Sequence, residues 1–232
     1  MDFRTAHKFT AKWEKGLVDH PRDPGGITKD GISIRFLESY AGSNTAWLQS
    51  IGVQLPVVPD TIRTLNTEQI DAIFERAFWL PLRPETFPPI TMLTLYDCSV
   101  NSGQGRAIRC LQEACNLFDG EKLNVDGAVG PKTRARAMEI GNRGLDFELA
   151  LKSVGFRETF LRSLSTFDAF GKGWMNRLED LRSELRKLSQ QVIVIPPAQV
   201  PSAETETLTI VRMELLRLVA IIDAELAKRQ TQ

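Results

Sequence analysis

The sequence is poor in histidine and cysteine, has no excess charge, and contains no long apolar run. Its two histidines argue against a zinc site, and its three irregularly spaced cysteines argue against a disulfide framework. Its 29 basic and 29 acidic side chains cancel, which argues against a nucleic-acid partner held by a broad basic surface. No uncharged apolar stretch reaches the ~18 residues of a membrane span, so we expect no insertion into a membrane.

The first residues also lack the apolar segment of a Sec-type signal peptide, because MDFRTAHKFTAKWEKG carries charges along its length. We therefore expect the protein to be made in the cytoplasm and to need assisted export if its substrate lies outside. No motif calls for a metal or another cofactor. We expect the cysteines to be small buried apolar residues: Cys98, Cys110 and Cys115.

What is present is mostly helical periodicity, in a chain that is 42% hydrophobic and 25% charged, as globular proteins are. A first helix that ends near Gly16 is predicted by apolar side chains at helical spacing: Ala6, Phe9, Thr10 and Trp13. Two prolines and three glycines then predict an irregular loop over residues 19–33, with a short hairpin around Ile27 to Ile32.

Later segments repeat the helical pattern. Asn66 and Gln69 form a helix-start box before an apolar face. Further helices are predicted up to the Asn101-Ser102-Gly103 end, from Gln104, from Pro131, and over 144–164 and 172–188, the last two separated by Gly171 and Gly173. We interpret residues 41–60, with Pro56 and Pro59, as a surface connection. The fold class is mainly α.

The C-terminal part differs in composition. Residues 191–203 are rich in valine, isoleucine and proline and predict an extended linker. Residues 204–232 predict a last helix, apolar at nearly heptad positions over 204–229. Two interpretations stay open: the helix packs back on its own domain, or it joins copies of the chain.

Glu14 is the candidate catalytic residue. It follows Trp13 at the end of the first apolar stripe, where the helix dipole and partial burial both disfavour a negative charge. A glycosidase general acid needs that protonated state near neutral pH. An ordinary solvated glutamate is the alternative interpretation.

The loop after Glu14 supplies partners for it. Asp23 and Thr28 lie on the returning glycine-rich segment, so a sugar held between helix and loop would meet chemistry on both faces. Asp23 before Pro24 is also a common turn residue, and Thr28 is also able to bond backbone only.

The segment Glu14 to Ile32, EKGLVDHPRDPGGITKDGI, resembles the signature of glycoside hydrolase family 108, a family of bacterial and phage N-acetylmuramidases. The similarity is strongest from Pro21 to Ile32, which contains the family's Asp-Pro-Gly-Gly-x-Thr. The sequence departs from the family pattern at Lys15, Leu17 and His20.

This resemblance keeps three residues in register and implies their roles. Glu14 is the general acid, while Asp23 and Thr28 hold water or support the intermediate. The implied fold is a lysozyme-like helical fold with a small glycine-rich hairpin at the active site and a C-terminal helical extension. The implied domains are a muramidase catalytic region over 1–103 and a peptidoglycan-binding-type helical region over 104–190 that completes the fold.

The same resemblance extends into the second half of the chain, over roughly residues 3–187 in all. Phe78-Trp79, the segment DCSVNSG, the turn DGAVGPKT and Gly173-Trp174-x-Asn-Arg177 resemble family elements. The residues predicted to contact substrate are Trp79, Tyr96, Asn101 and Thr133. For Asn101 a helix C-cap is the alternative, and for Thr133 and Trp174 it is helix packing.

The resemblance implies a hydrolase for the β-1,4 bond between N-acetylmuramic acid and N-acetylglucosamine, with glycan strands of peptidoglycan as partner. The enzyme would act on the periplasmic wall after holin-type or other assisted export, for lysis or local wall opening. Two alternatives are a catalytically impaired peptidoglycan-binding module and an interaction protein of an assembly or secretion machine that uses the 204–229 helix.

Overall fold

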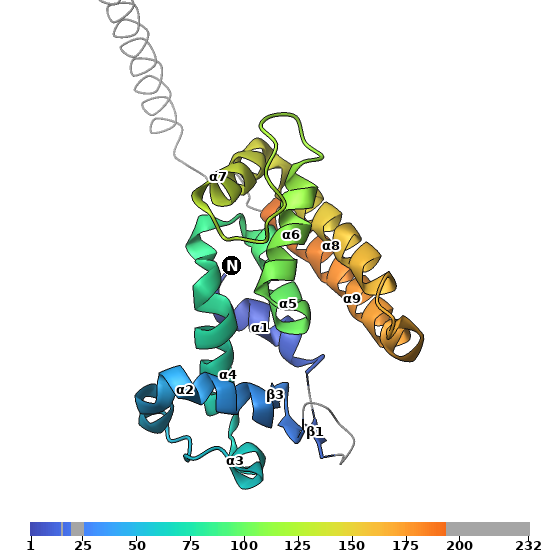
Figure 1. Ribbon diagram of the computed structural model, residues 1–232. Helices are drawn as coiled ribbons and strands as arrows, with labels where there is room; N and C mark the ends of the chain where they lie inside the picture. Colours follow the sequence, from blue (N-terminus) through green and yellow to red (C-terminus); the bar gives the residue numbers. More distant parts are fainter. Residues whose placement is uncertain (15, 20–25, 194–232) are drawn as a thin grey trace, which may run out of the picture. The chain divides into compact units, whose positions relative to one another are not determined.

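A computed structural model describes residues 1–14, 16–19 and 26–193, and Figure 1 shows how the helices are arranged. The fold is mainly α and lysozyme-like, as predicted. Met1–Ser189 form one compact unit, which contains both the predicted catalytic region and the helical region that follows it. None of the described helices combines the length and hydropathy that a bilayer crossing requires.

Helix α1 (Phe3–Ala11) begins at Asp2, whose carboxylate accepts the Thr5 amide at 2.8 Å. Its buried face, led by Ala6 and Phe9, is the predicted one. The helix ends earlier than predicted, however, and Trp13 and Glu14 lie in the turn that follows. Glu14 therefore stands beyond the helix, three residues after Ala11, and not on its last turn.

The glycine-rich segment forms the predicted hairpin inside a small antiparallel sheet. Strands β1 (Leu17–Val18), β2 (Thr28–Lys29) and β3 (Ile32–Ser33) pair in that order, with Val18 opposite Thr28 and Lys29 opposite Ile32. The β2–β3 turn uses positive φ at Asp30 (44°) and Gly31 (84°). Asp30 also ties the turn to β1, because its amide donates to the Gly16 carbonyl and its carboxylate accepts the Gly16 amide.

Two helices, α2 and α3, follow the sheet in the chain and precede α4. Helix α2 (Ile34–Ser50) covers much of 41–60, so the surface connection predicted there is wrong over its first ten residues. Of its side chains only Leu37 and Leu48 are buried, while its other apolar residues are partly or fully exposed, so the helix has no continuous buried face. Helix α3 (Pro59–Thr64) follows.

Helix α4 (Thr67–Phe74) begins with the predicted box, in which Asn66 and Gln69 exchange side-chain and backbone bonds. It continues as the π-turn η1 (Glu75–Trp79) and two 3-10 turns, η2 (Leu80–Leu82) and η3 (Pro84–Thr86).

The remaining helices form a packed group around α5 (Pro89–Ser102), whose side chains from Ile90 to Ser99 are all buried. Helices α6 (Gln104–Cys115) and α8 (Asp146–Arg162) pack on α5 and on each other. Helix α7 (Pro131–Ile140) and the π-turn η4 (Gly141–Leu145) lead into α8. In Figure 1, α9 (Phe167–Ile193, orange) lies alongside α8.

Two predicted boundaries change in this group. Gly171 and Gly173 lie inside α9 and do not separate two helices, because the chain reverses earlier, between Arg162 and Phe167. Helix α9 also continues to Ile193, so residues 191–193 of the predicted linker are helical. The rest of that linker and the 204–232 helix lie outside the described residues. The three cysteines are free and buried, as predicted.

Candidate active site

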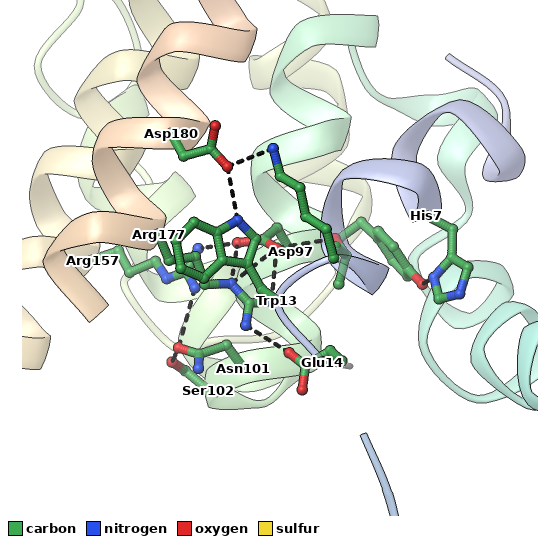
Figure 2. A network of polar contacts seen from close by, with 12 residues as sticks. His7, Trp13, Glu14, Asp97, Asn101, Ser102, Arg157, Arg177 and Asp180 are labelled. Carbon is green, nitrogen blue, oxygen red and sulfur yellow. Dashed lines mark hydrogen bonds and ion pairs between the residues drawn. The ribbon is translucent and has the colours of Figure 1, made fainter. Parts of the chain in front are cut away.

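The Glu14 carboxylate is held by an arginine from the far end of the compact unit. Its Oε1 atom accepts a hydrogen bond of 2.6 Å from Arg177 Nη1 on α9 (Figure 2), and its side chain remains 20% exposed. The turn after α1 thus presents one oxygen to a buried cation and leaves the residue accessible. The position at the end of the helix dipole that the sequence predicts for Glu14 is therefore wrong, because the residue lies in the turn beyond Ala11 and faces Arg177.

Arg177 is itself fixed by Asp97 on α5. Its Nη2 donates to Asp97 Oδ1 at 2.8 Å, and its Nε lies 3.1 and 3.2 Å from the two carboxylate oxygens. The hydroxyl of Thr10 on α1 donates to the same Oδ1 at 3.0 Å. This two-sided contact fixes the plane of the guanidinium, so the nitrogen that faces Glu14 has one direction.

A second arginine completes the charge balance around Asp97. Arg157 on α8 donates from Nη1 to Asp97 Oδ2 at 2.7 Å, and both side chains are essentially inaccessible, at 1% and 0% exposure. Burial alone would raise the pKa of Asp97, but Arg177 and Arg157 outweigh it and lower that pKa to about 2. Burial opposes the charge of Arg177, yet Asp97 and Glu14 raise its pKa above the ordinary value.

Asn101 joins this network at the end of α5. Its Oδ1 accepts from Arg157 Nη2 at 3.1 Å and from the Ser102 hydroxyl at 3.0 Å. The helix is closed by the Gly103 amide, which donates to the Ser99 carbonyl. The structure therefore brings Asn101 into one connected group with Glu14, which spacing alone did not indicate.

A second contact fastens the same turn to α9. The indole Nε1 of Trp13 donates to Asp180 Oδ2 at 2.9 Å, and Lys12 Nζ pairs with the same oxygen at 2.5 Å (Figure 2). Asp180 stands three residues, or about one helical turn, after Arg177, so consecutive turns of α9 hold consecutive residues of the α1 end.

The hairpin approaches Glu14 through Gly31. A Cβ atom at that glycine would meet the Glu14 side chain and the ring of Phe74. Thr28 lies on the neighbouring strand β2, is partly buried, and donates its hydroxyl to the Gly26 carbonyl at 3.2 Å. Asp23, Lys15 and His20 lie outside the described residues.

Two predicted substrate contacts lie in the core. Trp79 and Tyr96 are 4% and 0% exposed and pack edge to face with ring centroids 5.4 Å apart. The Tyr96 hydroxyl lies 2.7 Å from His7 Nδ1, and His7 Nε2 lies 3.2 Å from an Asp71 carboxylate oxygen. Because neither ring has surface to offer a sugar, we do not carry Trp79 and Tyr96 into the proposed site.

Thr133 is placed apart from this group, on α7. It is 3% exposed, and its hydroxyl accepts from Gln112 Nε2 at 3.1 Å. The same amide donates to Asp126 and its oxygen accepts the Gly127 amide, so Gln112 holds the turn DGAVGPKT on α6. These bonds agree with the packing alternative for Thr133. A pocket lies over this turn and is lined by residues that include Asn124, Lys132 and Thr133 itself.

The two arginines were missed as parts of the site. The sequence feature that could have pointed to them is Asp97, a carboxylate on the same helix face as the apolar residues Leu93, Tyr96 and Val100. A buried carboxylate requires cationic or hydrogen-bonding partners. Spacing does not tell which arginines those are, because Arg157 and Arg177 lie 60 and 80 residues away in the chain.

Known proteins resemble this chain in both sequence and fold. The sequence model of the family described as Glycosyl hydrolase 108 matches residues 7–103. Among the solved structures that match is SagA of Brucella abortus, with 26% sequence identity and a TM-score of 0.65 over 81% of this chain and 95% of that one. No curated protein matches the chain.

The matched segment contains Glu14, Thr28, Asp97 and Asn101, while Arg157 and Arg177 lie beyond it. The similarity to Glycosyl hydrolase 108 thus covers residues 7–103, the part of the chain that contains Glu14 and the hairpin.

Proposed function

We propose that the protein is an N-acetylmuramidase in which Glu14 is the general acid. The enzyme cleaves the β-1,4 bond between N-acetylmuramic acid and N-acetylglucosamine in peptidoglycan, and Glu14 gives its proton to the glycosidic oxygen. The observation that carries the proposal is the placement of Glu14: an accessible carboxylate, fixed by a buried arginine, inside the segment that matches Glycosyl hydrolase 108.

Cleavage of a glycosidic bond requires a second group on the opposite face of the sugar. The hairpin provides the position for it, since Gly31 touches Glu14 and Thr28 lies on the adjoining strand. We assign that face to Thr28 and Asp23, which together hold the attacking water or support the sugar cation. The assignment of Asp23 rests on its sequence register with Glu14 and Thr28.

Mass spectrometry of digested muropeptides tests the bond that is cleaved. We expect new reducing ends on N-acetylmuramic acid. Reducing ends on N-acetylglucosamine, or released stem peptides, would contradict muramidase action.

The catalytic assignment is tested with Glu14→Gln, which keeps the shape of the side chain and removes the proton. We expect activity on purified walls to fall at least ~100-fold, as expected for loss of a general acid. Glu121→Gln is the matched control, because Glu121 is exposed and pairs only with exposed Lys132 among the described contacts. Asp23→Asn and Thr28→Ala test the second face by the same assay.

A wall-pelleting assay separates this proposal from a binding module. If wild type binds walls and releases no muropeptides, the chain is a binding module and the proposal fails. If Glu14→Gln binds walls as wild type does but no longer cleaves them, catalysis is assigned to Glu14. Host lysis or local opening of the wall is the setting that we propose for this cleavage.

A further inference from the structure

We propose that Arg177 is a positioning residue for catalysis, which aims the Glu14 carboxylate from outside the segment that carries the family pattern. This inference rests on the proposed role of Glu14. It adds that this role requires Arg177, a residue of α9. It assigns a task to the buried ionic cluster formed by Glu14, Asp97, Arg157 and Arg177.

The cluster pairs two cations with two anions: Arg157 and Arg177 with Asp97 and Glu14. Three members are 6% exposed or less, and Glu14 is the accessible one at 20%. Glu14 is therefore the member of the cluster that a substrate is able to reach, and Arg177 is the cation that contacts it.

Arg177 holds its two carboxylate partners by unequal contacts. Arg177 uses Nε and Nη2 on Asp97 and only Nη1 on Glu14. The stronger two-point contact fixes the guanidinium, and the single bond to Oε1 fixes the carboxylate while leaving Oε2 uncommitted to the arginine. Oε2 is the atom that faces the hairpin, since a Cβ at Gly31 would lie 3.2 Å from it. We assign proton delivery to Oε2.

Other titratable groups surround Glu14. Asp97 and Arg157 act through Arg177, while His7 and Tyr96 sense the Glu14 charge through space. Asp30 in the hairpin turn is bound to the Gly16 amide. Of these groups, Arg177 alone has a hydrogen bond to Glu14 among the described contacts, so its removal is the sharpest perturbation.

The test compares Arg177→Met, Arg177→Lys and Arg182→Met in the full chain. Arg182 is the matched control, because it also lies on α9 and pairs across to Glu158 on α8, with no contact to Glu14. For each variant, kcat and KM on soluble glycan fragments are measured per molecule shown to be folded by urea unfolding.

We expect Arg177→Met to lower kcat by roughly 10- to 100-fold with little change in KM, because the acid is misplaced. Arg177→Lys should restore only part of kcat, because lysine keeps the charge and loses the two-point contact. Arg182→Met should change neither kcat nor KM.

Three results would overturn the inference. The first is wild-type kcat in folded Arg177→Met. The second is a loss of activity that follows the folded fraction alone. The third is a rise in KM with an unchanged kcat, which a misplaced acid would not give. Each of these leaves the proposed function standing if Glu14→Gln is inactive, whereas an active Glu14→Gln would refute the proposed function itself.

Discussion

Gly31 packs directly against Glu14: a Cβ atom at residue 31 would lie 3.0 Å from the Glu14 Cβ and 2.9 Å from the ring of Phe74. The backbone of Gly31 also has a φ of 84°, a region that side chains disfavour. Space and conformation therefore both require glycine where the hairpin meets the candidate acid.

Gly31→Ala should destabilise the fold by about 1–3 kcal/mol, from the positive φ and the forced contact. It should also lower kcat in the molecules that remain folded, because the new methyl pushes on Glu14. Urea unfolding and wall-clearing assays measure the two effects. The control is Gly42→Ala in α2, where a Cβ meets nothing within 4 Å. That change should stabilise by about 0.5–1 kcal/mol. A silent Gly31→Ala would contradict the close packing.

Asp97→Asn should destabilise the protein by about 3–5 kcal/mol, because it leaves two buried arginines without their shared counter-charge. Equilibrium unfolding in urea at neutral pH measures the loss. Glu121→Gln breaks an exposed ion pair and should change stability by less than about 1 kcal/mol. Equal losses of unfolding free energy for the two substitutions would show that the buried cluster contributes no more to stability than an exposed ion pair does.

The Asp97 carboxylate should also make the stability of the protein depend on pH in acid. Its folded-state pKa is lowered from 3.8 to about 2, so its contribution to stability is complete above pH ~4 and is lost as the pH falls toward 2. Wild type should therefore lose stability in that window more steeply than Asp97→Asn does. Parallel curves for the two proteins between pH 4 and 2 would refute this assignment.

The sequence predicted more of the helices than of the site. The Asn66 box, Pro131 and the Asn101-Ser102-Gly103 end mark helix boundaries through local chemistry, and the structure confirms all three. Helix α2 escaped because it buries only two side chains and keeps most of its surface outside. Local signals are sufficient where a cap or a continuous apolar face is present.

The site required contacts that no local pattern contains. Glu14 and Thr28 were found because family spacing holds them in register within one short segment. Arg177 was noticed only as part of a terminal motif, since its task depends on α9 lying over the end of α1. Trp79 and Tyr96 were interpreted as substrate contacts, because an aromatic residue in or next to a motif does not reveal whether its ring faces a cleft or the core.

His7 should be neutral in the folded protein at neutral pH. Burial lowers its pKa below 6.5, although Asp71 works to raise it. The stability that depends on neutral His7 is therefore complete above pH 6.5 and falls as the pH drops toward the lower folded-state pKa. Proton NMR measures the titration, and His20→Gln assigns the signals because the chain has two histidines.

Asp71→Asn provides the matched test for this histidine. It should lower the His7 midpoint further, because a charge that favours the protonated ring is removed. A midpoint above 6.5 in wild type, or an upward shift in Asp71→Asn, would contradict the buried environment of His7.

Trp174→Ala should reduce stability by about 2–3 kcal/mol with catalytic constants of the folded enzyme nearly unchanged. Trp174 is half-buried and packs on the core between Phe167 and Phe170, at centroid distances of 6.3 and 5.8 Å. Phe170 is 58% exposed, so Phe170→Ala should cost less than about 1 kcal/mol. A selective rise in KM for Trp174→Ala would instead make the ring a sugar contact.

The contacts between the turn after α1 and helix α9 also affect when the site forms during folding. Trp13 and Asp180 are 167 positions apart, and Glu14 and Arg177 are 163 apart, so these contacts close nearly the longest loop of the compact unit. Such non-local contacts form late and slowly in folding. A chain still emerging from the ribosome, or one cut before α9, holds its glutamate without the arginine. Competence to cleave the wall should therefore arise only when the whole unit has been synthesised and closed.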